Sequence, residues 1–159
     1  MIAAAYRVER ITSERLDRLD ALVDLFAEVF HDRESYNAHR PDHAYLRALL
    51  SKQDFIALVA LIDEQIVGGL VAYELQKFEQ RRSEIYIYDL AVADAYRRQG
   101  IATALIEQLQ RIAAARGAYV IFVQADYGDD PAIALYTKLG KREDVMHFDI
   151  AVPERQSLR

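Results

Sequence analysis

The sequence predicts an α/β protein with one mixed, mostly antiparallel sheet that carries helices on its faces. Three observations predict it: a hairpin of apolar strands over 55–75, a strand–helix unit over 84–116, and another over 118–139. A hairpin pairs antiparallel, whereas a strand–helix unit brings the chain back for parallel pairing. The expected order is one strand, two helices, three strands, then helix, strand, helix and strand.

The first half of the chain contains the expected α-helical pair and the hairpin. Residues 4–10 are expected to form a strand, and apolar residues at three- and four-residue steps predict a helix over 13–30. A polar stretch over 31–40 leads to Pro41, which suits the first turn of a short second helix. Strands are expected over 55–62 and 66–75, where Gly68-Gly69 predicts a bulge or a close approach of backbones.

The second half alternates strands and helices after a charged loop over 76–83. Residues 84–92 are rich in β-branched and aromatic side chains, which favour a strand. A helix over 101–116 is expected to end at Gly117, and a second one over 131–139 at Gly140. Strands are predicted over 118–124 and 144–152. We therefore expect a single domain over 1–152 and a flexible tail over 153–159.

The composition excludes several classes of function. The 159 residues include 20 Lys and Arg against 25 Asp and Glu, a net charge of −5, which disfavours a nucleic-acid partner. The absence of cysteine excludes disulfides, thiolate metal sites and a cysteine nucleophile. The histidines do not have metal-ligand spacing, so no metal is expected. No apolar run reaches the length of a membrane span, and we expect no membrane partner and a cytoplasmic location.

The loop Arg97–Thr103 joins a predicted strand to a predicted helix. The first turn of a helix has unpaired N–H groups and partial positive charge, and can therefore bind a pyrophosphate. Gly100 and Ala102 leave room for phosphate oxygens, and Arg97 and Arg98 add charge. The alternative is an ordinary turn with solvent-exposed arginines. The loop lacks the glycines of a dinucleotide-binding fingerprint and the ending of a P-loop.

Two ordered motifs resemble those of the GNAT N-acetyltransferases. Arg97-x-x-Gly100-x-Ala102 resembles the acetyl-CoA signature, and Ala134–Gly140 is similar to a second motif of that superfamily. Longer strings resemble the aminoglycoside 3-N-acetyltransferases of the gentamicin-modifying type, over about residues 22–150. These strings are Lys77–Gln80, Ser83–Val92, Arg97–Ile106, Gln124–Pro131 and Val145–Ile150.

The resemblance implies the GNAT fold, in which two central strands splay apart around the pantetheine arm of acetyl-CoA. It places Leu90, Ala91 and Val92 along pantetheine and Tyr136 beside the cofactor sulfur. The residues that it implies for the pyrophosphate region are Arg97, Arg98, Gln99, Gly100, Ile101, Ala102 and Thr103. Asp129 stands where the superfamily often has a cofactor-contacting Asn, and Lys141 where it often has Phe. Homodimers are common in the superfamily, so a second copy is an expected type of partner.

Acyl transfer to an amine requires a base, a stabilised oxyanion and a protonated leaving thiolate. The backbone N–H of Leu90 or Val92 can stabilise the oxyanion, and Tyr136 can protonate the sulfur, unless it is a structural tyrosine packed on the sheet. The base is expected to be a carboxylate or a water held by one, and the candidates are Glu84, which we favour, then Asp89, and Asp126, which we expect to bind the substrate instead. Strand alternation puts Glu84 and Asp89 on opposite faces unless a bulge intervenes. Each carboxylate could instead be merely solvated or ion-paired.

Acidic residues near the expected acceptor cleft suggest a cationic substrate. Asp126 follows a strand, where ligands bind in open α/β sheets, and Asp149 lies on the expected last strand. Such carboxylates attract a polycation and bind its ammonium groups. Asp129 or Asp130 could alternatively cap the next helix. The resemblance implies that Glu34 and Tyr36 line the other wall of the cleft.

The expected function is transfer of acetyl from acetyl-CoA to the 3-amino group of a 2-deoxystreptamine aminoglycoside such as gentamicin, which confers antibiotic resistance. The transfer is expected to be direct, in a ternary complex without metal. One alternative is a GNAT enzyme for another cationic amine, a polyamine or a peptide N-terminus. Another is a module that binds acetyl-CoA without turnover.

Overall fold

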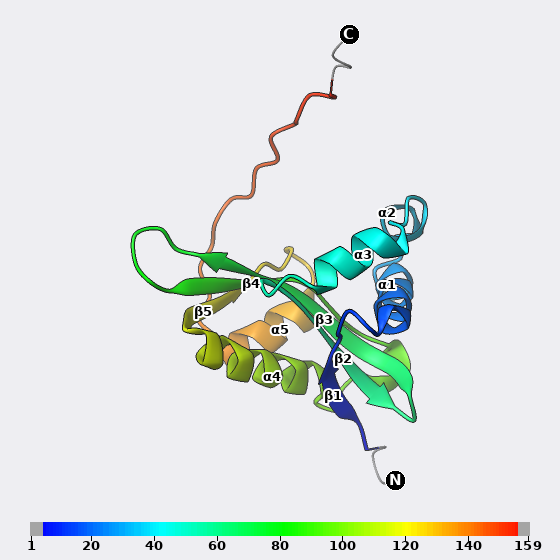
Figure 1. The fold of residues 1–159 in the computed structure, drawn as a ribbon. Coiled ribbons are helices and arrows are strands. Elements are labelled where there is room, and N and C mark those ends of the chain that lie inside the picture. Colours follow the sequence, from blue (N-terminus) through cyan, green and yellow to red (C-terminus); the bar gives the residue numbers. More distant parts are fainter. Residues whose placement is uncertain (1–4, 156–159) are drawn as a thin grey trace. The chain divides into compact units, whose positions relative to one another are not determined.

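The five strands form one mixed sheet in the order β1-β2-β3-β4-β5 (Figure 1). The computed structural model describes residues 5–155. The strands are β1 (Arg7–Arg10), β2 (Phe55–Ile62), β3 (Gln65–Gln76), β4 (Ser83–Val92) and β5 (Ala118–Val123). The first four pair antiparallel and β5 runs parallel to β4, which confirms the predicted mixed sheet. Ala4, with which the first strand was expected to begin, lies outside the described residues.

Two compact units make up the chain, Met1–Gln124 and Ala125–Arg159, and each is described by itself. The helices of the first unit are α1 (Leu16–Val29), α2 (Arg33–Asn37), α3 (His43–Leu50) and α4 (Ile101–Arg116), with a short 3₁₀ helix over Asp94–Tyr96. Helix α2 differs from the expectation of a polar connection. It forms because the Asp32 side chain accepts a hydrogen bond from the Ser35 N–H at 3.0 Å and so caps the helix.

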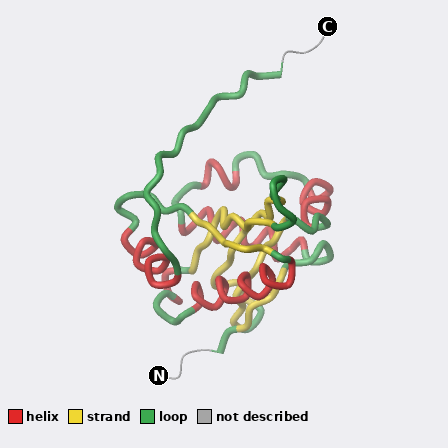
Figure 2. Tube along the Cα trace, turned by 90° about the vertical axis from the view of Figure 1, so that its left-hand side faces the viewer, coloured by secondary structure: helices red, strands yellow, loops and turns green. Residues whose placement is uncertain are grey.

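Helices α1 and α4 pack on opposite faces of the sheet, as two adjacent glycines of β3 demonstrate. A Cβ on Gly68 would meet the Ile101 side chain of α4 at 3.0 Å, and one on Gly69 would meet the Leu22 side chain of α1 at 2.1 Å. Successive residues of a strand point to opposite faces, so the two helices lie on either side. Figure 2 shows the strands lying between helices. At Gly68-Gly69 the close approach is thus of helix side chains, and the predicted bulge lies next to the pair, where Val67 is an extra residue on β3.

A β-bulge in β4 reverses the alternation of its side chains. Val71 pairs with Asp89 and the next residue of β3, Ala72, pairs with Ile87, so Tyr88 is an extra residue on β4. Before the bulge, Tyr86 faces the α1 side and Ile87 the α4 side. After it, Asp89 and Ala91 face α1, and Ala91 belongs to the apolar core formed with that helix. The bulge thus turns Asp89 toward α1 and α2.

The second unit contains helix α5 (Asp130–Leu139) and an extended segment over 141–155. The Asp129 side chain caps α5 by accepting the Ala132 N–H at 3.3 Å. The prediction of a strand over 144–152 is wrong, because no residue from 141 to 155 is in a helix or strand. Apolar residues do alternate with polar ones along 146–150, but the segment is exposed, and Phe148 is 75% exposed. Alternation describes side chains only, whereas a strand also requires a hydrogen-bonded neighbour.

Within residues 5–155, no helix is both long and apolar enough to cross a bilayer.

Candidate active site

The loop before α4 has the geometry of an anion site. Gly100 adopts the left-handed conformation at φ +81°, and the Ala104 N–H donates to the Gly100 carbonyl at 3.0 Å as helical pairing begins. The N–H groups of Ile101, Ala102 and Thr103 precede this bond, so the helix leaves them without intrahelical acceptors. They form the first turn of α4 and carry the positive end of its dipole.

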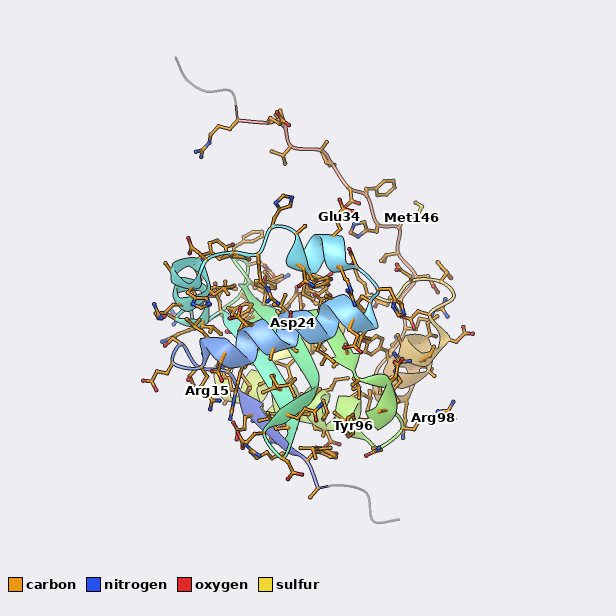
Figure 3. The ribbon with its side chains drawn as sticks, turned by 90° about the vertical axis from the view of Figure 1, so that its right-hand side faces the viewer. Arg15, Asp24, Glu34, Tyr96, Arg98 and Met146 are labelled. Atoms are coloured by element: carbon orange, nitrogen blue, oxygen red, sulfur yellow. The ribbon has the colours of Figure 1, made fainter. Side chains whose placement is uncertain are left out.

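The two arginines of the loop are placed differently. Arg97 forms an ion pair with Asp94 at 2.9 Å, and its Nε lies 3.5 Å from the Val92 carbonyl. Arg98 has φ +62°, which is strained for a residue with a side chain. Among the described residues it has no ion pair. Figure 3 shows Arg98 on the loop that leads into α4, with Tyr96 just before it on the chain.

Tyr6 is a residue of this loop region that the motif did not indicate. Its hydroxyl donates to the Gly100 carbonyl at 3.4 Å, across 94 positions of the sequence. Tyr6 lies just before β1 and Gly100 just before α4, so only the fold brings them together. A lone tyrosine at the start of the chain carries no sequence signal for such a contact.

The end of β4 is open on the side of β5. Pairing between these strands ends at Ile87 with Val123, so Tyr88–Val92 have no partner on β5 in the described structure. The Ala93 N–H donates to the Val67 carbonyl of β3 at 2.8 Å. Strand N–H groups alternate in direction, so those of Leu90 and Val92 point away from β3, into the open side. These are the two N–H groups that the sequence analysis named for the oxyanion.

Asp89 is a half-buried carboxylate at this open end. Its Oδ2 accepts a hydrogen bond from the Tyr36 hydroxyl of α2 at 2.9 Å. Burial raises the pKa of Asp89, and the hydrogen bond from Tyr36 opposes that rise. Burial, together with the Asp89 contact, also raises the pKa of Tyr36, which stays protonated as the donor. The structure thus joins two residues that the sequence analysis named separately, one as a base and one as a substrate contact.

Glu84 occupies the other end of β4, where it is engaged by two partners. Its Oε1 accepts from the Tyr119 hydroxyl at 2.5 Å and lies 3.4 Å from Lys77 Nζ. The Tyr119 hydrogen bond, followed by the contacts with Lys77, lowers the pKa of Glu84. Five positions of a strand separate Glu84 from Asp89, about 16 Å at the usual rise per residue. The structure therefore does not bring the two candidate bases together.

The remaining predicted site residues lie apart from Asp89 on the chain. Glu34 is exposed on α2, two positions before Tyr36 (Figure 3). Tyr136, Asp126, Asp129 and Asp149 belong to the second unit. There burial, with the charge of Asp129, raises the pKa of Tyr136 to about 12, and Asp149 pairs with His147 at 2.9 Å. The Asp129 carboxylate is engaged as the cap of α5.

The part of the chain that the structure describes has no cluster of metal ligands. Residues 5–155 contain no group of three or more His, Asp or Glu side chains arranged to hold a metal ion.

Comparisons with known proteins agree with this geometry. The acetyltransferase (GNAT) family model matches residues 19–141. An aminoglycoside acetyltransferase from an uncultured soil metagenomic sample is 58% identical, covering 94% of this chain and 99% of its own, with a TM-score of 0.92. Another from such a sample, solved in complex with sisomicin, is 34% identical over 93% of this chain and 97% of its own, with a TM-score of 0.85.

A curated relative has a different name. The N-alpha-acetyltransferase of Saccharolobus solfataricus is 25% identical over 136 residues, which cover 81% of this chain and 77% of that protein. The family match spans most of the chain, and the fold is that of the solved acetyltransferases. The chain therefore belongs to the acetyltransferase (GNAT) family and is an enzyme of that family.

Proposed function

We propose that the enzyme transfers the acetyl group of acetyl-CoA to the 3-amino group of a 2-deoxystreptamine aminoglycoside such as gentamicin. The observation that carries the proposal is Asp89, a half-buried carboxylate held by Tyr36 at the open end of β4. A carboxylate with a raised pKa suits the removal of a proton from an ammonium group. The two soil aminoglycoside acetyltransferases support an aminoglycoside as the acceptor.

Acetyl-CoA, the donor that the family uses, fits two features of the first unit. The free N–H groups at the start of α4 would bind its pyrophosphate, aided by Arg98. Gly100 has no side chain to block that approach. One of the outward N–H groups of Leu90 and Val92 would pair with the pantetheine arm, which needs amide partners along an extended chain, and the other would remain for the oxyanion.

The proposed reaction is a direct transfer between donor and amine. Asp89 takes a proton from the ammonium group, and the lone pair of the deprotonated nitrogen attacks the carbonyl carbon of the thioester. The N–H of Leu90 or Val92 stabilises the oxyanion. As the carbon–sulfur bond breaks, Tyr136 donates its proton to the thiolate, and the nitrogen then loses its second proton, which returns Tyr136 to its protonated form. Its pKa of about 12 keeps it protonated at neutral pH, which an acid requires.

The charge of the enzyme supports a polycationic acceptor. The chain carries a net charge of −5, and Glu34, Asp126 and Asp149 are exposed carboxylates. We propose that they bind the further ammonium groups of the antibiotic. Acetylation neutralises an ammonium group and so removes a cationic contact of the drug, which is how the enzyme would confer resistance in the cytoplasm.

The test is a CoA-release assay with gentamicin, spermidine and a peptide, each with acetyl-CoA. We expect release with gentamicin at the highest kcat/KM, and a product whose acetyl group maps to the 3-amino nitrogen by NMR. Asp89→Asn serves as the matched control, because it keeps the shape of the side chain and removes the base. No release with gentamicin, despite binding of CoA, contradicts the proposal. A product acetylated at another nitrogen contradicts the 3-N assignment alone.

A peptide N-terminus is the second candidate acceptor, favoured by the N-alpha-acetyltransferase among the relatives. A peptide carries one α-amino group near neutral pKa and needs less help from a base than an amine of high pKa. The same assay separates the two: the peptide would be the better substrate, and Asp89→Asn would retain most of the activity toward it.

A further inference from the structure

A row of aromatic side chains crosses the sheet on the α1 side, in register on four strands. Phe55 pairs with Tyr73, Tyr73 with Tyr86, and Tyr86 with Phe122. The ring centroids of Tyr86 and Phe122 lie 4.8 Å apart with an interplanar angle of 6°, and those of Phe55 and Tyr73 lie 5.5 Å apart. Cross-strand partners lie side by side on one face of a sheet, so these four residues line the same face, with Phe55 buried at one end of the row.

Tyr88, the extra residue of the bulge, stands beside this row. Its ring meets Tyr73 and Tyr86 edge to face, with both centroid distances at 5.8 Å. Tyr88 is nevertheless 60% exposed and Tyr73 is 36% exposed. Contiguous exposed aromatic surface usually marks a place of contact rather than a packing defect. The next residue on the chain is Asp89, the carboxylate of the proposed base.

The arrangement fits a ring that carries ammonium groups. The C–H faces of a saturated ring bury apolar surface against aromatic side chains, and an ammonium group on that ring is attracted to an aromatic face. An amine held on Tyr88 is next to Asp89, which can take its proton. A flexible acyclic polyamine offers the charge without the rigid face. The row therefore suits ring-borne amines better than acyclic ones.

We infer that Tyr88, supported edge to face by Tyr73 and Tyr86, is the platform on which the acceptor ring packs, and that it selects ring-borne amines. This inference rests on the proposed function and adds the residue that sets the acceptor class. It assigns a binding role to tyrosines that no motif of the sequence indicated. Tyr36 also contacts Asp89, to which its hydroxyl donates a hydrogen bond.

The experiment compares Tyr88→Ala, Tyr88→Leu and Tyr88→Phe with the native enzyme. The alanine and leucine variants should raise KM for gentamicin by roughly tenfold, the size expected when the acceptor ring loses its packing on an aromatic face together with the ammonium group that the ring holds there. KM for acetyl-CoA and for spermidine should stay within about twofold, because neither uses the ring face. The phenylalanine variant keeps the face and should restore tight binding of gentamicin. Leucine keeps bulk without the aromatic face, which separates the two contributions.

Phe78→Ala is the matched control, because Phe78 is an exposed aromatic residue of the β3–β4 loop, outside the row. It should leave all three KM values unchanged. A gentamicin KM for Tyr88→Ala within twofold of native, or an equal rise with spermidine, overturns the inference.

A binding titration separates this inference from the proposed function. Calorimetry measures gentamicin binding to the native enzyme and to Tyr88→Ala, independently of turnover. If the native enzyme binds gentamicin through Tyr88 but releases no CoA, the function fails and the platform stands. If it acetylates gentamicin and both proteins bind it equally, the platform fails and the function stands. Absence of both binding and turnover refutes both.

Discussion

The hydroxyl of Tyr36 should determine the pH below which the enzyme loses activity. It donates to Asp89 at 2.9 Å and holds down a pKa that burial raises. Tyr36→Phe removes this donor and keeps the ring, whose centroid lies 6.0 Å from Phe26 and 5.9 Å from Phe30. The change therefore acts on the hydrogen bond and leaves the aromatic packing in place.

The size of the effect follows from the energy of that hydrogen bond. A hydrogen bond to a charged group contributes ~1.5–3 kcal/mol, and a pKa unit corresponds to about 1.4 kcal/mol. Solvent reaches the half-buried pair and screens part of this energy, so we expect the pKa of Asp89 to rise by about one unit. Because a base acts in its deprotonated form, the acid limb of kcat/KM should move up by about one pH unit. The plateau at high pH should change little.

The assay is CoA release with gentamicin, followed as a function of pH for two matched variants. Tyr119→Phe is the control, because it removes the hydroxyl that donates to Glu84 and lowers the pKa of that carboxyl. Both variants share one substrate, so titration of the substrate amine affects them alike. If Asp89 is the base, only Tyr36→Phe moves the acid limb. If the acid limb of the pH profile of kcat/KM moves in Tyr119→Phe and not in Tyr36→Phe, the base is Glu84 and the reasoning is refuted.

Four further substitutions test other parts of the enzyme. Asp89→Asn should lower kcat/KM by about 10²–10⁴-fold. Burial raises the pKa of Asp89 in the folded protein above its ordinary value of 3.8. The native enzyme therefore loses stability as pH rises from the pKa of the unfolded chain through that of the folded protein, where Asp89 becomes charged. Asp89→Asn has no charge at this position and should unfold at an equal or higher urea concentration than the native enzyme at pH 7. A less stable variant contradicts this account. Gly100→Ala at φ +81° should lose about 1–2 kcal/mol in urea unfolding and raise KM for acetyl-CoA, and an unchanged KM argues against phosphate binding at this loop. Gly69→Ala places a Cβ 2.1 Å from Leu22 Cδ1 and should lower the free energy of unfolding by about 1–3 kcal/mol. A variant as stable as the native enzyme would show that α1 can shift to make room for the Cβ. Tyr136→Phe should slow turnover by about 10²–10⁴-fold, and a rate within twofold of native removes its role as the acid.

Local patterns in the sequence predicted most elements of the first unit. The apolar stripe of 13–30 corresponds to α1, and Gly100 and Gly117 flank α4 with left-handed conformations, as glycines at helix ends do. The mixed sheet followed from the hairpin and the strand–helix unit. These features depend on residues within a few positions of one another, and they can therefore be predicted from the sequence alone. The last strand was predicted from the same kind of pattern and is wrong, because pairing depends on a distant segment.

The candidate site was predictable in its residue types and less so in its arrangement. The loop that we propose to bind phosphate was predicted from Gly100 and its place before a helix. Alternation alone would turn Asp89 to the α4 side with Ile87, and the sequence contains no signal for the bulge that reverses this. The contacts of Asp89 with Tyr36 and of Gly100 with Tyr6 span 53 and 94 positions. Such contacts are set by the tertiary fold, and no local motif encodes them.

The bulge of β4 makes the number of residues in that strand as important as their identity. Removing Tyr88 would let Ile87 and Asp89 follow each other in regular pairing with β3, without altering any other side chain. Residues on both sides of the deletion would then keep their partners on β3 and their faces, and only the side chain of Tyr88 would be lost. Relatives that differ by one residue here can therefore share every catalytic side chain and yet present a different acceptor wall.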